Sequence, residues 1–119
     1  MPVAAMEYGM EESRIETIEK MLSAEPDDLF LRYALAMELR KADRLDESLV
    51  AFVALMAHDP PHVPAFFMAA QQLAGDGDCA QARQYLVEGI GHAETQGQLH
   101  AASEMTEMLA TLPDDPQGD

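Results

Sequence analysis

Apolar residues recur at intervals of three or four positions in six stretches of the chain, which is the spacing of one face of an α-helix. The first stretch spans about 11–24, and the second spans about 29–41. The remaining four carry apolar residues from Leu45 to Met56, from near Pro64 to the break at Gly75, from Asp78 to about Ala93, and over about 98–112. No segment alternates apolar and polar residues as a half-buried strand would. The pattern therefore predicts an all-α chain of six helices with short connections.

Acidic residues stand where several of these predicted helices begin. The pair Asp27 and Asp28 follows Pro26 and is suited to cap the second helix. Asp43 is placed to cap the third helix, and Asp78 with Gln81 resembles the capping box that opens a helix. These side chains indicate that the helix boundaries are encoded locally.

The chain repeats itself with a period of 34 residues. Pro26 and Pro60 lie 34 positions apart, and each follows an acidic residue. The same step relates four further pairs of small or large residues: Ala36 to Ala70, Leu39 to Leu73, Ser48 to Ala82, and Phe52 to Leu86. A period of this length with small and large residues in fixed register indicates stacked helical hairpins.

The repeating unit resembles the tetratricopeptide repeat, in which a pattern of large and small residues over two helices closes with a proline. The first complete repeat covers about 29–62 and the second about 63–96. The matching residues are Arg32, Leu35, Ala36, Leu39, Ser48, Phe52 and Pro60 in the first repeat, and Phe66, Ala69, Ala70, Leu73, Ala82 and Leu86 in the second. Two residues depart from the pattern, because Arg32 replaces a large aromatic residue and Glu94 replaces the closing proline.

The resemblance implies a right-handed superhelical stack of antiparallel helical hairpins with about six helices. It extends over a single domain at 11–112, in which helices at 11–24 and 98–112 flank the two complete repeats. Residues 1–10 are expected to form a flexible N-terminal segment, and 113–119 an acidic tail. Within each hairpin the small residues are expected to let the two helices pack closely.

In this family the first helices of the hairpins line a concave groove that holds a partner. The resemblance therefore implies a groove formed by residues of the second, fourth and sixth predicted helices: Phe30, Tyr33, Ala34, Met37, Lys41, Phe67, Met68, Gln71, Ala101 and Met105. Such a surface, rich in methionine and aromatic side chains, suits a peptide or an amphipathic helix of another protein. The alternative is that the sixth helix or the N-terminal segment folds over the groove and fills it.

The formal net charge of −15 limits the partners. It argues against binding nucleic acid, whose phosphates would be repelled, and against docking on an anionic membrane surface. Basic residues gather in one region, where Arg40, Lys41 and Arg44 form a candidate contact for an acidic group of a partner. The alternative is that these residues pair with neighbouring acidic side chains and complement the C-terminal end of the second helix.

Few residues in the chain suggest targeting or chemistry. The longest apolar run, at 49–57, is too short to span a membrane, and residues 1–10 contain no Lys or Arg, unlike a secretory signal. The single cysteine, Cys79, allows no internal disulfide, so a cytoplasmic location is expected. His58 and His62 flank two prolines that break a helix, so no metal site is expected there. No set of nucleophile, base and oxyanion donors is evident, so neither an enzyme nor a cofactor is expected.

These observations lead to one main functional hypothesis, an adaptor or scaffold that binds a peptide or helix of another protein. A small acidic chaperone for a secreted or assembling client is an alternative, because such chaperones are similar in size and charge. A structural subunit that forms homo-oligomers through its Met- and Phe-lined face is a further alternative. All three functions depend on binding protein, and they differ in the partner.

Overall fold

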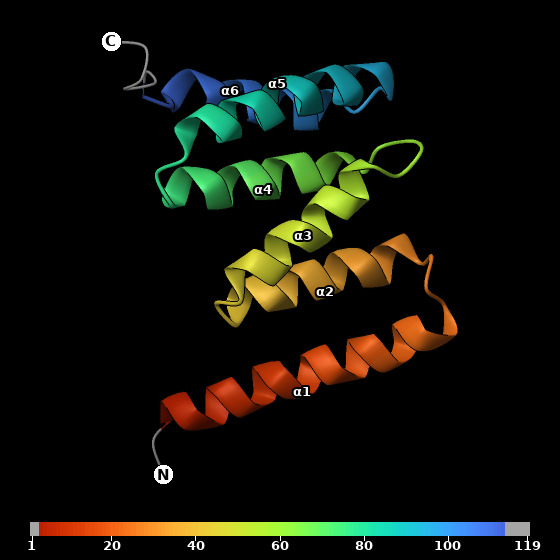
Figure 1. Cartoon of the computed structure of the whole chain (residues 1–119). Coiled ribbons are helices and arrows are strands. Elements are labelled where there is room, and N and C mark those ends of the chain that lie inside the picture. The colour runs from red at the N-terminus through yellow and green to blue at the C-terminus, as the bar shows by residue number, and fades with distance from the viewer. Residues whose placement is uncertain (1–2, 114–119) are drawn as a thin grey trace. The chain divides into compact units, whose positions relative to one another are not determined.

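Six helices account for most of residues 3–113, which are the residues that the structure, a computed structural model, describes. In chain order they are α1 (Val3–Ala24), α2 (Leu29–Lys41), α3 (Leu45–Met56), α4 (Val63–Gly75), α5 (Cys79–Thr95) and α6 (Leu99–Thr111) (Figure 1). The predicted all-α class is confirmed, and five of the six helices have bounds within about two residues of those expected from the apolar pattern.

The first helix is longer than the apolar stripe predicted. It begins at Val3 rather than near residue 11, so residues 3–10 of the segment expected to be flexible are helical. This stretch lacks proline and contains alanine, methionine and glutamate, which favour a helix without forming a regular apolar stripe. Of the acidic tail expected at 113–119, only Pro113 is among the described residues.

Three helices end in the same hydrogen-bonded turn. After α2, α4 and α5 the chain passes through one residue in the left-handed region: Asp43 with φ of 62°, Gly77 with φ of 87° and Gly97 with φ of 74°. The next amide then donates to the carbonyl five positions earlier: Arg44 to Leu39 at 2.9 Å, Asp78 to Leu73 at 2.9 Å, and Gln98 to Ala93 at 2.8 Å. This arrangement is the Schellman motif, and it turns the chain sharply into the next helix.

Asp43 ends α2 and does not cap α3, so the predicted role of this residue is wrong. The amide of Ser48 donates to the carbonyl of Arg44 at 3.0 Å, which makes Arg44 the residue from which α3 starts. Asp43 stands one repeat before Gly77, at a position where glycine costs least because it has no Cβ. A short polar side chain is tolerated there, and the carboxylate is used for no cap.

The two other predicted caps are confirmed. The Asp28 carboxylate accepts a hydrogen bond from the Leu31 amide at 3.0 Å, and the Asp78 carboxylate accepts one from the Gln81 amide at 3.1 Å. Each bond satisfies one of the amides that the first turn of a helix leaves without a partner.

The chain divides into two compact units, Met1–Leu55 and Met56–Asp119, here called unit 1 and unit 2. Unit 1 holds α1, α2 and nearly all of α3, and unit 2 holds α4, α5 and α6. Each unit has its own packing. The expectation of one domain over 11–112 stays a prediction.

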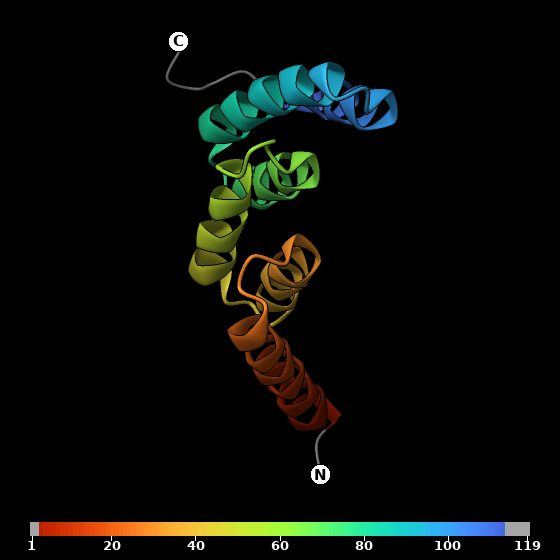
Figure 2. The same ribbon diagram turned by 90° about the vertical axis from the view of Figure 1, so that its right-hand side faces the viewer.

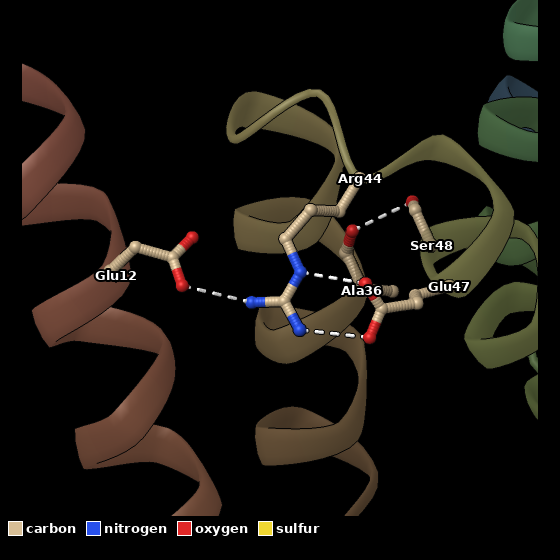
Figure 3. A network of polar contacts seen from close by, with 5 residues as sticks. All are labelled: Glu12, Ala36, Arg44, Glu47 and Ser48. Carbon is tan, nitrogen blue, oxygen red and sulfur yellow. Dashed lines mark hydrogen bonds and ion pairs between the residues drawn. The ribbon is translucent and has the colours of Figure 1, made fainter.

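In unit 1, α2 packs against both α1 and α3 (Figure 2). Ile15 of α1 is buried with Leu39 and with Ala42, which follows α2. On the α3 side, the buried Ser48 hydroxyl donates to the Ala36 carbonyl at 2.9 Å (Figure 3). The small residues predicted to face each other in this hairpin therefore do so, and a hydrogen bond joins them.

In unit 2, α5 packs against α4 and α6. Gly89 in the middle of α5 is buried, and a Cβ placed on it would lie 2.6 Å from the Phe66 Cβ and 2.7 Å from the Met105 sulfur. Only a glycine allows α4 and α6 to approach α5 this closely. Gln96 donates to the Pro61 carbonyl at 2.9 Å, which ties the end of α5 to the start of α4.

Candidate functional site

A stripe of α2 faces outward in unit 1 and contains four of the ten predicted groove residues. Phe30, Ala34, Met37 and Lys41 follow one another at steps of four, three and four positions, so they share one face of the helix. Phe30 is 80% exposed, which is unusual for a phenylalanine, while Ala34 and Met37 are half-buried. The stripe is therefore accessible and largely apolar.

Ala34 and Met37 lie on the floor of a cleft between α1 and α2. The cleft has a volume of about 310 Å³ and is also lined by Ser13, Arg14, Thr17, Ile18 and Glu38. The α1 residues of this cleft were not among the predicted groove residues. In the structure Ile15 is buried and Ile18 is half-buried at the cleft, because the stripe of α1 is wider than its contact with α2.

An ion-paired carboxylate borders this cleft. Glu38 of α2 accepts from the Arg14 guanidinium of α1 at 2.7 Å and from the Lys41 ammonium at 3.2 Å. The hydrogen bond from Arg14 lowers the pKa of Glu38; burial opposes this shift and the nearby Lys41 reinforces it. Lys41 thus lies at the edge of the cleft with its charge partly compensated.

Tyr33 belongs more to the packing of unit 1 than to the exposed stripe. Its ring meets the buried ring of Phe52 edge to face, with centroids 6.0 Å apart and an interplanar angle of 61°. Burial raises the pKa of the Tyr33 hydroxyl, and the charge of Arg40 partly offsets the effect. The half-buried ring presents only part of its surface.

Arg44, one of the three basic residues considered as a contact for a partner's acidic group, is held within unit 1. Its guanidinium binds both oxygens of Glu47, at 2.7 and 2.8 Å, and it also contacts Glu12 of α1 at 3.1 Å (Figure 3). The hydrogen bonds to Glu47 raise the pKa of Arg44 and lower that of Glu47. Arg44 and Lys41 therefore form the internal pairs that the alternative interpretation described.

The predicted residues of unit 2 divide into two groups. Phe67, Met68 and Gln71 of α4 and Ala101 of α6 are half-buried, so part of each side chain is accessible. Met105 is only 1% exposed, so it lies in the core of unit 2 and lines no accessible surface. Gly89 permits the close contact of Met105 with α5. A glycine in the middle of a helical pattern is the sequence signal that could have indicated such a contact.

The described residues offer little for chemistry or membrane insertion. Among residues 3–113, no group of three or more His, Cys, Asp or Glu side chains is arranged to hold a metal ion. Cys79 is half-buried at the start of α5. Within the same part of the chain, every helix falls short of the length and apolar character needed to cross a bilayer.

Two proteins resemble the chain over most of its length, although no protein-family model matches it. The TPR repeat-containing protein PA0015 of Pseudomonas aeruginosa is 33% identical over 101 residues, a match that covers 82% of this chain and 93% of that protein. The solution structure of protein BPP2914 from Bordetella parapertussis has a TM-score of 0.70 at 28% identity, and the match covers 82% of this chain and 85% of that one. In both cases the similarity extends well beyond one repeat.

Proposed function

Because the chain belongs to the tetratricopeptide-repeat family, whose members are generally non-enzymatic interaction modules, we propose that it binds a peptide or helix of another protein. The observation that carries this proposal is the accessible stripe of α2. An 80% exposed phenylalanine, Phe30, shares one helix face with the floor of the cleft between α1 and α2. Large apolar side chains are kept on a surface at a cost in solubility, and an accessible apolar surface usually marks an interface.

The size of the cleft suits side chains better than a cofactor. Its volume of about 310 Å³ is at the lower end of the range for small-molecule sites, and it is lined by both polar and apolar residues. We expect Phe30 to lie against the partner while an apolar side chain of the partner contacts Ala34 and Met37. The accessible parts of Phe67, Met68 and Gln71 on α4 are proposed as a second contact of the same kind within unit 2.

Selection from a random peptide library on the full-length protein tests the proposal. Enriched peptides should bind the wild type, and a Met37→Glu variant should bind them about tenfold more weakly or worse, because a carboxylate would have to be desolvated at the contact. The matched control is Val87→Glu, since Val87 is 57% exposed on α5 and lies far along the chain from the cleft. Helicity measured by circular dichroism should be the same for both variants.

The opposite pattern would reject this site. If Met37→Glu retains the affinity of the wild type while Val87→Glu loses it, the interface is not the cleft between α1 and α2. Sedimentation at several concentrations addresses self-association. A dimer that dissociates on substitution of Met37 would identify a second copy of the chain as the occupant.

A further inference from the structure

A second apolar surface of unit 1 lies between α1 and α3, over α2. Two adjoining clefts form it, with volumes of about 470 and 260 Å³, and both are lined by Leu35, Ala51 and Ala54. Leu22 and Val50 extend the apolar lining toward α1 and α3. We call this surface the α1/α3 groove. It is distinct from the cleft used in the proposed function, because the two share no lining residue.

One residue that lines the groove differs in kind from its equivalent in the second repeat. Phe66, one repeat after Arg32, is 2% exposed and packs with its ring centroid 5.3 Å from that of His92. At the equivalent position of unit 1, Arg32 is half-buried and lines the groove. An arginine stem covers apolar surface, but its charged end stays in water, so it does not fill the space that a buried aromatic ring would fill.

The sequence of α3 also indicates that this side of the helix is covered by a partner. Residues 49–56 are all apolar, although a helix on the surface of a protein needs an apolar stripe on one side only. Val50 is 70% exposed and Val53 is 39% exposed. Val50 lies directly at the groove, so burying it against another chain would remove an exposed apolar side chain from water.

The charge around the groove selects the kind of partner. Three acidic residues line it: Glu19, Asp46 and Glu47. Of these three, only Glu47 is ion-paired with Arg44. Among the described residues, no basic side chain forms an ion pair with Glu19 or Asp46. Arg32 lies in the smaller of the two clefts. With a net charge of −15 over the whole chain, the field at this surface attracts cations.

We propose that the α1/α3 groove binds a basic amphipathic helix of a partner protein. Apolar side chains of the helix would contact Leu35, Ala51 and Ala54, and flanking Lys or Arg side chains would pair with Glu19 and Asp46. A helix fits because the groove runs between two helices and the alanines of α3 allow another helix to come close. The chain itself is a poor occupant, since its C-terminal residues 114–119 carry three acidic side chains and no basic one.

Binding of two synthetic peptides by fluorescence anisotropy tests this inference on the full-length protein. The first is an amphipathic helix of about 18 residues built from leucine and lysine, and the second has glutamate in place of each lysine. The Leu/Lys peptide should bind at least about tenfold more tightly than the Leu/Glu peptide. Raising the NaCl concentration from about 50 to about 300 mM should weaken its binding several-fold, because the charges are at the surface.

Substitutions then locate the binding surface. Val50→Lys should weaken the Leu/Lys peptide about tenfold, because it introduces a like charge into the apolar contact. Val87→Lys makes the same change at an exposed valine of α5 and should leave the affinity within about twofold of the wild type. If Val50→Lys and Val87→Lys lose affinity for the Leu/Lys peptide equally, the peptide is bound only by the general attraction of an acidic protein. That result would overturn the inference. A loss confined to Met37→Glu would also overturn it. A concentration-dependent dimer that Val50→Lys abolishes would overturn the inference too, because the groove would then bind a second copy of the chain.

Discussion

Arg32 and Phe66 occupy equivalent positions of the two repeats, and the surroundings of these residues show how differently the units are built. Phe66 is buried against His92 and the backbone of Gly89 in unit 2. Arg32 lines a cleft in unit 1. One repeat pattern thus holds a buried aromatic ring in unit 2 and a half-buried arginine beside a cleft in unit 1. A repeat tolerates this difference because each hairpin needs only enough contact with its neighbours to be stable.

The contacts between helices within each unit also differ between unit 1 and unit 2. In unit 1 the helices are joined by ion pairs of Arg14 and Arg44 and by the buried hydroxyl of Ser48, which donates to a backbone carbonyl. Its equivalent in unit 2 is Ala82, which is fully buried and has no polar atom in its side chain. Ser48 thus adds to unit 1 a directional hydrogen bond that the alanine of unit 2 cannot make.

The largest expected effect is on the close packing of unit 2. Gly89→Ala should destabilise this unit by about 2 kcal/mol, because the added methyl group would overlap Phe66 and Met105. Gly91→Ala is the matched control, since nothing lies within 4 Å of its Cβ position, and it should stabilise α5 by about 0.5–1 kcal/mol. Hydrogen exchange of the α5 amides measures both. Equal effects of the two substitutions would contradict the close approach at Gly89.

An intermediate effect is expected at the turns that end α2 and α4. Asp43 and Gly77 are equivalent and both have positive φ, of 62° and 87°. Asp43→Gly should therefore stabilise unit 1 by roughly 0.5–1 kcal/mol, whereas Gly77→Ala should destabilise unit 2 by about 1 kcal/mol. Thermal unfolding would reveal the two opposite shifts. A loss of stability for Asp43→Gly would mean that the carboxylate has a role beyond tolerating the turn.

The smallest effect is a pH dependence confined to unit 1. The hydrogen bond from Arg14 lowers the pKa of Glu38 in the folded chain below its ordinary value of 4.5. The resulting stabilisation is therefore present above pH 4.5 and is lost as the pH falls through the folded pKa. Glu38→Gln removes this contribution, so the difference in unfolding free energy between wild type and variant should shrink from pH 7 to pH 3. An unchanged difference over that range would show that the ion pair does not stabilise the fold.

Much of the local structure could be predicted from the sequence, and the reasons are visible in particular residues. Asp28 and Asp78 cap helices because an acidic side chain can reach an amide three positions away, whatever the rest of the chain does. The pairing of Ala36 with Ser48 followed from the repeat, which places small residues where two helices approach. Asp43 was misassigned because an aspartate serves equally well in a left-handed turn and at the start of a helix.

The candidate site was less predictable, because it depends on contacts between helices. Met105 shares the apolar face expected of a groove residue, yet the approach of α6 to Gly89 buries it. The contribution of Ser13, Thr17 and Ile18 to the α1/α2 cleft depends on how α1 lies against α2, which no spacing within α1 specifies. The hydrogen bond from Arg44 to Glu12 likewise joins residues that lie 32 positions apart in the sequence.

By itself the sequence determined the all-α class, the six helices, the caps of α2 and α5, and the repeat family. These features depend on residues within a few positions of each other or on a period that is legible along the chain. Tertiary structure alone decided which apolar residues are covered and which are accessible, as Met105 and Phe30 illustrate. The physical reason is that burial depends on how closely neighbouring helices approach, and the absence of a side chain at Gly89 allows the approach that buries Met105.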